Sequence, residues 1–279
     1  MKKNRKLLLL LGATASLFLS PMGIQAQESD GIQEYIPSES LHMENIPAEV
    51  RSIVMNEKNQ VDTGKEYLTD AQVESISDAQ ITKIYDELKS NDMFSQATVN
   101  LDELVAEKLL EAEETPQTFN NSYLPDGYNN LNDAEKRLVK LFPAEALTYY
   151  VKSKQALETS KSLYSNAHLV DGNGDAFRHA YWNAILVQGF GEISRFGTVE
   201  EKALHGVDRT SVWTTAHEAD SSGLPKEMDM NNNRVGQYHA YLNYQASDEK
   251  LKNDLVRMVD QGQMARIVNG RLTATNSDK

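Results

Sequence analysis

The sequence contains no cysteine, which excludes disulfide bonds, thiolate chemistry and cysteine-liganded zinc. Exported proteins often use disulfides, but a chain of 279 residues is long enough to bury a hydrophobic core without them. A lipid anchor on cysteine is excluded as well.

Basic residues are few: 28 Lys and Arg stand against 41 Asp and Glu, a formal net charge of −13. Nucleic acids and anionic membranes attract proteins through clustered lysine and arginine. The sequence has no basic stripe with interleaved aromatic residues. We therefore expect no nucleic acid as the main partner, although a nuclease that bridges phosphates through a metal ion is compatible with this composition.

Long apolar runs are also scarce, and the one at residues 7–19 is shorter than the roughly 20 residues that span a bilayer. Basic residues 2–6 precede it, and small residues up to Ala26 follow it. This order is typical of a secretory signal peptide. We expect a signal peptide at 1–26, cleaved near Ala26, and a secreted protein with no transmembrane segment after cleavage. The alternative is a retained N-terminal anchor. Any substrate would be extracellular or at the cell surface.

The rest of the chain divides by composition and hydrophobic periodicity. Periodicity is absent at first, becomes helical near Thr69, and is interrupted by a segment rich in proline and asparagine before it sharpens again. We predict a mainly α protein with a disordered spacer at 27–66, a small helical region at 67–114, a linker at 115–130, a helical domain of about six helices at 131–262 and a tail at 263–279.

Several boundaries within this helical domain can be predicted. Asn132 and Glu135 have the spacing of a capping box, and Pro143 suits the first position of the next helix. A helix from Asp175 is expected to end near Gln188, where glycines follow. We expect a variable segment up to Asp208, a short helix that carries Trp213, His217 and Glu218, a loop at 219–226 and a helix from Asp229 to Tyr244.

Asp175 and His179 are four residues apart on a predicted helix, so both side chains project from one face. Two groups with lone pairs at this spacing can share a metal ion. The alternative is an exposed Asp–His ion pair beside a buried Trp182.

Two further segments carry polar residues of interest. His217 and Glu218 are adjacent, so at most one of them is expected to face the same point from a helix. Asparagines 231–233 follow Asp229, although three asparagines in a row cost helix stability. Either some of these side chains reach inward to bind, or the segment is an N-terminal cap with surplus polar residues.

Together these residues offer the oxygen and nitrogen ligands that suit zinc, manganese or magnesium. Glu218 is the candidate general base on a bound water, and Arg178 would pair with a carboxylate or hold an anionic substrate group. The candidate metal ligands are Asp175, His179, His217, Asp229 and Asn233.

These motifs resemble an uncharacterised bacterial helical domain over about residues 131–245. The resemblance is carried by Asn-Asp-Ala-Glu-Lys at 132–136, Asp-Ala-Phe-Arg-His-Ala-Tyr-Trp-Asn at 175–183, Ala-His-Glu at 216–218 and Met-Asp-Met-Asn-Asn-Asn-Arg-Val-Gly at 228–236. That family occurs in secreted and surface proteins and has no established activity. This chain departs from it in a longer segment at 191–210 and in Asn231. The resemblance implies importance for Asp175, Arg178, His179, Trp182, Asn183, His217, Glu218, Asp229, Asn232 and Asn233.

The first hypothesis for function is a secreted divalent-metal-dependent hydrolase that acts on a phosphoester, a lipid head group, or a peptide or cell-wall bond. The alternative is a non-catalytic secreted or surface protein in which the polar cluster is a buried hydrogen-bond network that fixes helix packing. A third hypothesis is a toxin-like effector whose region 66–114 binds a partner.

Overall fold

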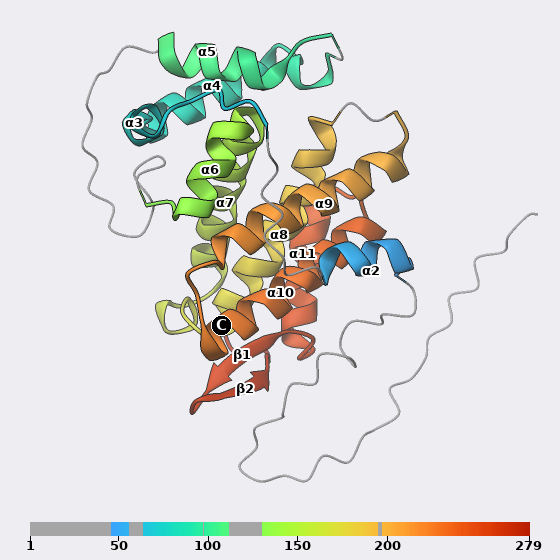
Figure 1. The fold of residues 1–279 in the computed structure, drawn as a ribbon. Coiled ribbons are helices and arrows are strands. Elements are labelled where there is room, and N and C mark those ends of the chain that lie inside the picture. The colour runs from blue at the N-terminus through green and yellow to red at the C-terminus, as the bar shows by residue number, and fades with distance from the viewer. Residues whose placement is uncertain (1–45, 56–63, 97, 112–129, 195–196) are drawn as a thin grey trace, which may run out of the picture. The chain divides into compact units, whose positions relative to one another are not determined.

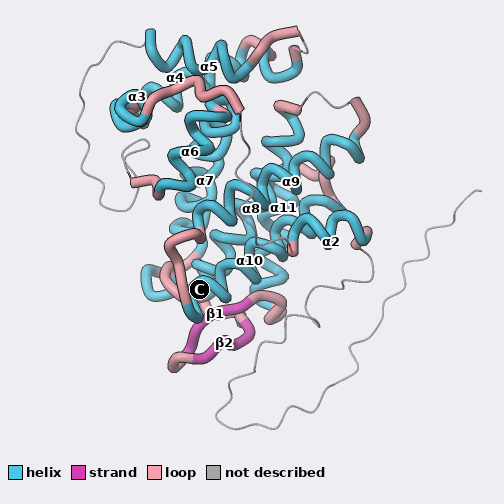
Figure 2. Tube along the Cα trace, in the orientation of Figure 1, coloured by secondary structure: helices cyan, strands magenta, loops and turns pink. Residues whose placement is uncertain are grey.

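The structure is a computed structural model that describes residues 46–55, 64–96, 98–111, 130–194 and 197–279. Helices make up most of these residues, together with one two-stranded sheet (Figure 2). The prediction of a mainly α protein is thus confirmed. The signal peptide predicted at 1–26 and nearly all of the linker predicted at 115–130 lie outside the described residues. No described helix combines the length and the apolarity that a membrane span needs.

The elements are labelled in Figure 1. In chain order the described elements are α2 (Ala48–Val54), α3 (Asp70–Ser75), α4 (Asp78–Ser90), η2 (Met93–Ser95), α5 (Leu101–Glu111), α6 (Asp133–Leu141), α7 (Pro143–Leu163), η3 (Asn166–His168), α8 (Asn173–Glu192), α9 (Val199–His217), α10 (Gly223–Leu242), α11 (Asp248–Asp260), β1 (Ala265–Val268) and β2 (Arg271–Ala274).

Helix α8 is the central element of the region that carries the candidate site. It contacts α7, α9, α10 and α11, and almost all of its residues are buried. Two glycines let its neighbours approach very closely: a Cβ atom at Gly206 of α9 or Gly236 of α10 would lie 2.0 Å from a carbonyl oxygen of α8, that of Val187 or Ala180 respectively. Backbone contact at these two points fixes α9 and α10 against α8 and so determines which side chains can meet.

The start of the helical domain agrees with the sequence. Asn132 and Glu135 form the predicted capping box at α6, and Pro143 is the first residue of α7. The six helices α6 to α11 match the number expected for the described part of residues 131–262.

The prediction that glycines end the helix near Gln188 is wrong, because α8 continues to Glu192. These glycines let neighbouring side chains pack closely against α8 and do not end the helix. A Cβ atom at Gly189 would lie 2.6 Å from a methyl carbon of Thr148, and one at Gly191 would lie 2.2 Å from the hydroxyl of Tyr244.

Two helices begin earlier than predicted. Helix α9 starts at Val199 inside the segment predicted to be variable, because Thr198 and Glu201 form a capping box there. Helix α10 starts at Gly223 inside the segment predicted to be a loop. Pro225 is tolerated there, since the N–H groups of the first helical turn have no partner within the helix.

Residues predicted to form a disordered spacer include the helix α2. Val50 and Val54 are one turn apart, both are buried in the main core, and the helix contacts α9. The described helices of the small helical region also join this core, since α4 and α5 contact α7.

The C-terminal segment, predicted to be a tail, forms an antiparallel β hairpin beside α10 (Figure 1). The side chain of Asn232 in α10 accepts from the backbone N–H of Ala265 and donates to its carbonyl, both at 2.9 Å. The side chain of Asn173 in α8 likewise donates to the backbone carbonyl of Asn276 and accepts from its backbone N–H. These side-chain contacts, which hydrophobic periodicity cannot reveal, hold the segment against the two helices that carry the candidate site.

Candidate metal centre

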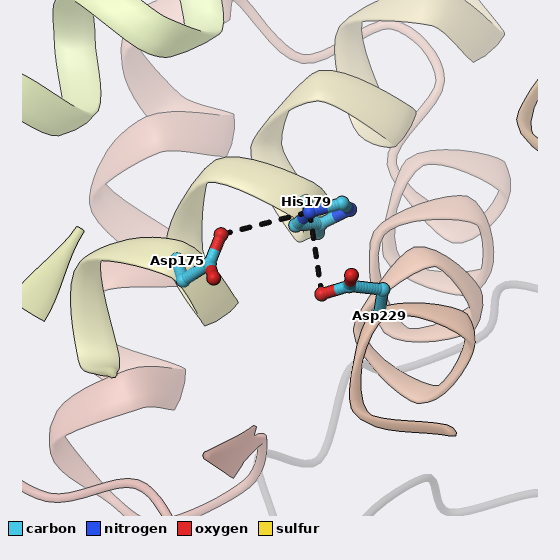
Figure 3. Close-up of side chains that lie close together, drawn as sticks. All are labelled: Asp175, His179 and Asp229. Atoms are coloured by element: carbon cyan, nitrogen blue, oxygen red, sulfur yellow. Dashed lines mark ion pairs between the residues drawn. The ribbon is translucent and has the colours of Figure 1, made fainter. Parts of the chain in front are cut away.

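Three potential metal ligands meet where α8 lies against α10 (Figure 3). Asp175 and His179 come from α8 and Asp229 from α10, and one ligand atom of each lies within 4.8 Å of the others. Nε2 of His179 is 3.6 Å from Oδ1 of Asp175 and 3.3 Å from Oδ1 of Asp229. Asp175 and His179 are buried, and the Asp229 side chain is 16% exposed. We call these three residues the Asp–His–Asp triad.

Helix packing explains why the triad forms. Asp175 and His179 lie one turn apart on the same face of α8. On α10, Asp229 lies about two turns before Gly236, whose backbone touches α8 at Ala180. The close approach at Gly236 therefore places Asp229 beside the first turns of α8.

A chain of amide hydrogen bonds determines which nitrogen of His179 carries a proton. Nδ2 of Asn183 donates to the backbone carbonyl of His179 at 2.9 Å, and a carbonyl can only accept, so the orientation of this amide is fixed. The same Nδ2 donates to Oδ1 of Asn233 at 2.7 Å, and Gln237 donates to Oδ1 of Asn183 at 2.7 Å. Oδ1 of Asn233 lies 3.2 Å from Nδ1 of His179, so Nδ1 is the protonated nitrogen.

The unprotonated Nε2 of His179 then directs its lone pair toward two carboxylates. Oδ1 of Asp229 is buried and has no hydrogen-bond partner among the described residues. Three electron-pair donors at such distances repel one another unless a proton or a cation lies between them. The triad therefore has the arrangement of a cation site.

Electrostatics in the triad agree with this arrangement. Burial, followed by the negative charges of Asp175 and Glu218, raises the pKa of Asp229 to about 8. Burial, followed by the positive charges of Arg178 and His217, lowers the pKa of His179 well below its ordinary value. At neutral pH the metal-free triad thus holds a neutral imidazole and a protonated Asp229, and a divalent cation would displace that proton.

Asp175 is oriented by two contacts outside the triad. Its Oδ2 accepts a hydrogen bond from the backbone N–H of Asp171 at 2.7 Å, and the guanidinium of Arg178 donates to its Oδ1. The sequence left two roles open for Arg178, and the structure pairs it with a carboxylate. Its side chain is 27% exposed, so this ion pair lies at the edge of the site.

A second cluster, built on the buried Glu135, lies beside the triad. Oε1 of Glu135 accepts from the hydroxyl of Tyr149 at 2.6 Å and lies 2.9 Å from Nδ1 of His217. The ring of Trp182 contacts the rings of both His217 and His179, with centroid distances of 5.1 and 6.4 Å. We call Glu135, Tyr149 and His217 the Glu135 cluster.

Glu218, the candidate base, is the C-terminal cap residue of α9 and is buried. The hydrogen bonds of the described residues include one from Lys226 to its backbone carbonyl, at 2.7 Å, but none to its carboxylate. Its negative charge contributes to the raised pKa of Asp229, which places the carboxylate near the triad.

The structure thus brings together three of the five predicted metal ligands. Asn233 contacts Nδ1 of His179, on the opposite side of the ring from the carboxylates. His217 lies outside the triad, because its Nδ1 is engaged by Glu135.

Sequence reasoning missed Glu135, Tyr149 and Gln237 as parts of the site. Glu135 has the spacing of a helix cap, and it does form that cap, so its local pattern carried no sign of a second role. Tyr149 and Gln237 are buried polar residues whose partners come from other helices, so no spacing within one helix could identify them.

Comparison with known protein families matches residues 136–263 to a domain of unknown function (DUF6973). The match contains the whole triad and agrees with the resemblance to an uncharacterised family. No curated protein and no solved structure matches the chain. The function must therefore be argued from the site itself.

Proposed function

We propose that this protein is a secreted divalent-metal-dependent hydrolase whose metal ligands are Asp175, His179 and Asp229. The observation that carries the proposal is the convergence of an unprotonated imidazole nitrogen and two carboxylate oxygens, one of them buried without a hydrogen-bond partner among the described residues. The signal peptide predicted at 1–26 is the reason to place the reaction outside the cell.

The ligand set suits zinc or manganese, and its two carboxylates are compatible with magnesium. Three protein ligands leave a coordination position open, which is typical of catalytic rather than structural sites. A divalent ion held there would act as a Lewis acid on water and on the substrate.

The surrounding residues have matching roles in this proposal. Asn233 accepts from Nδ1 of His179 and so keeps Nε2 free to bind the ion. Arg178 holds a ligand carboxylate and lies exposed enough to meet an anionic group of the substrate. Glu218 has a carboxylate free of described hydrogen bonds and is the general base.

One observation favours the alternative of a structural network. The amides of Asn183, Asn233 and Gln237 connect α8 to α10, and Gln237 also lies 3.3 Å from Thr214 of α9. This chain would fix helix packing without any metal ion. It does not account for two carboxylates facing a neutral imidazole, so we prefer the metal centre.

The test is elemental analysis of purified residues 27–279 after incubation with zinc, manganese or magnesium and removal of excess ion. The variants are His179→Ala and Asp229→Asn, with Asp254→Asn as the matched control. Asp254 is also a buried carboxylate 3.3 Å from a histidine, His239, but it has Lys250 and Arg257 as cationic partners.

We expect one equivalent of ion in the wild-type protein and in Asp254→Asn, and none in the two triad variants, with all folded by circular dichroism. The loaded protein is then assayed on esters, phosphodiesters and cell-wall fragments. Absence of bound ion in the wild-type protein, together with unfolding of His179→Ala, would overturn the metal centre and leave the structural network.

A further inference from the structure

His217 is held in a way that suits proton transfer better than metal binding. Glu135 is an acceptor at neutral pH, so the Nδ1 atom of His217 that lies 2.9 Å away carries a proton toward it. The other ring nitrogen, Nε2, is on the opposite edge of the ring. The His217 side chain is 40% exposed, whereas Glu135 is buried, so the ring extends from the cluster toward solvent.

Besides His217, two groups hold the carboxylate of Glu135 in place. Tyr149 donates to its Oε1 at 2.6 Å, and the backbone N–H of Asn132 donates to its Oε2 at 2.9 Å. The side-chain amide of Asn132 also donates to the carbonyls of Ala216 and His217, at 2.8 and 3.2 Å. The capping box of α6 therefore holds the end of α9 and sets His217 against Glu135.

The Glu135 cluster is next to the triad. The ring of Trp182 is in contact with the rings of both His217 and His179. Glu218, the proposed base, directly follows His217 in the chain. An acid and a base at one centre are what hydrolysis of an unactivated bond requires.

We propose that His217, oriented by Glu135, is the general acid of the site and protonates the leaving group of the substrate. The inference rests on the hydrolase function proposed above and refines its substrate class. It implies a bond to an unactivated leaving group, such as an alkyl ester, an alkyl phosphodiester or an amide, because such a group leaves readily only when it receives a proton.

Water gives one proton to the carboxylate of Glu218 while its oxygen forms a bond to the reacting carbon or phosphorus. The bond from that atom to the leaving oxygen or nitrogen breaks, and the leaving atom takes the proton from Nε2 of His217. Glu218 then returns its proton through solvent to His217, which restores both groups.

The charges around His217 are consistent with this role. Partial burial of the ring lowers its pKa. The hydrogen bond and negative charge of Glu135, with the charge of Glu218, outweigh this effect and that of Arg178 and leave the pKa of His217 raised. Tyr149 donates a hydrogen bond to Glu135 and keeps its proton, since burial raises the pKa of its hydroxyl well above the ordinary value.

The first test is ¹⁵N nuclear magnetic resonance of the histidine side chains with and without Zn²⁺. We expect His217 to titrate with Nδ1 protonated throughout and to keep titrating when Zn²⁺ is bound, while the signals of His179 shift. Loss of the His217 titration on addition of Zn²⁺ would make it a metal ligand and overturn the proposal.

The matched variants for this test are Glu135→Gln and Glu201→Gln. Each replaces the glutamate of a capping box by glutamine, which keeps the cap. We expect Glu135→Gln to lower the pKa of His217, because the negative charge of Glu135 raises it, and Glu201→Gln to leave it unchanged. Equal pKa values of His217 in the two variants would contradict the proposal that Glu135 orients His217.

The second test measures the hydrolysis rates of His217→Gln and of the wild-type protein, both loaded with zinc. The substrates are two series of carboxylic and phosphoric esters. The acids are the same in both series, and the leaving group is 4-nitrophenol in one and an alkyl alcohol in the other. General acid catalysis contributes about 10²–10⁴-fold. We expect a loss of that size on the alkyl series and less than tenfold on the 4-nitrophenyl series. Equal losses on both overturn the general-acid role and leave the hydrolase intact. Failure of the wild-type protein on every substrate overturns the hydrolase and the acid role with it.

Discussion

Asn231, Asn232 and Asn233 are consecutive in α10, so their side chains point in directions about 100° apart. Each amide has a different partner: Asn231 donates to the carbonyl of Glu227 in its own helix, Asn232 pairs with Ala265 of the hairpin, and Asn233 contacts His179. All three are buried. Contacts of Asn232 with the hairpin and of Asn233 with α8 therefore offset the low helix propensity of the three asparagines.

The first prediction concerns Asp229 in the metal-free protein. Its pKa is raised from 3.8 to about 8 on folding, so the folded state keeps a proton that the unfolded chain releases. The resulting contribution to the free energy of unfolding is complete below pH 4 and is lost as the pH rises to 8. Asp229→Asn, which is neutral at every pH, should therefore be more stable than the wild-type protein at pH 8.5, by about 1 kcal/mol or more.

Urea unfolding at pH 5 and at pH 8.5, with a chelator present, measures this difference. The advantage of Asp229→Asn should grow with pH. The same comparison for Asp254→Asn should show a loss of stability at both pH values, because Lys250 and Arg257, which are cationic at both, contact that carboxylate. If the difference in unfolding free energy between Asp229→Asn and the wild-type protein is the same at both pH values, the raised pKa of Asp229 is contradicted.

The triad shows how far residue spacing can predict a site. Asp175 and His179 were paired by their spacing on one helix, and Asp229 was singled out with the asparagines that follow it. The Glu135–His217 contact spans 82 residues and joins two helices, so no local pattern predicts it. His217 was consequently placed among the metal ligands although the structure gives it a carboxylate partner.

At the scale of elements, a cap or a proline identified some helix starts and not others. The capping box of α6 and the proline of α7 were recognised, whereas the capping box of α9 and the proline in the first turn of α10 were not. The helix ending predicted near Gln188 was wrong because glycine has two uses. It ends helices, and it also lets helices touch, which depends on packing partners that a single segment does not reveal.

The second prediction follows from the contact of α10 with α8. Gly236→Ala would place a Cβ atom 2.0 Å from the carbonyl oxygen of Ala180, so the helices must separate. We expect a loss of about 1–3 kcal/mol in unfolding free energy, measured with urea. We also expect weaker zinc binding, because Asp229 moves away with α10. Gly197→Ala, with no atom within 4 Å of the new Cβ, is the control and should change stability by less than about 0.5 kcal/mol.

The third prediction concerns the hairpin. Asn232→Ala removes both hydrogen bonds to Ala265 and leaves a buried N–H and carbonyl without partners, so we expect a loss of about 2–3 kcal/mol. Trypsin should then cleave faster at Arg271 in β2. Asn231→Ala is the matched control, because its bond lies within α10 and alanine favours helix. Equal cleavage rates in the two variants would show that Asn232 does not hold the hairpin.

At the scale of the whole molecule, the proposed metal centre lies between two helices, α8 and α10, that are far apart in the chain. An ion that binds the folded state and not the unfolded state stabilises the protein by about 2.7 kcal/mol when the ion concentration is 100 times Kd. For a protein of this size we therefore expect zinc to raise Tm by about 5–10 °C and a chelator to reverse the change. Differential scanning calorimetry measures both. An unchanged Tm in the wild-type protein at saturating zinc would contradict binding to the folded state.

The triad is divided between α8 and α10, which are separated in the chain by all of α9. Its ligands therefore meet only after these helices have docked, and an unfolded chain has no formed site. A chain that crosses a membrane unfolded, as the proposed signal peptide requires, would then arrive without its ion. The supply of metal in the compartment where folding is completed would decide which ion is bound. Protein folded instead in the cytoplasm of a production host would carry the ion of that cytoplasm, so its metal content should be compared with that of protein secreted into medium of defined composition.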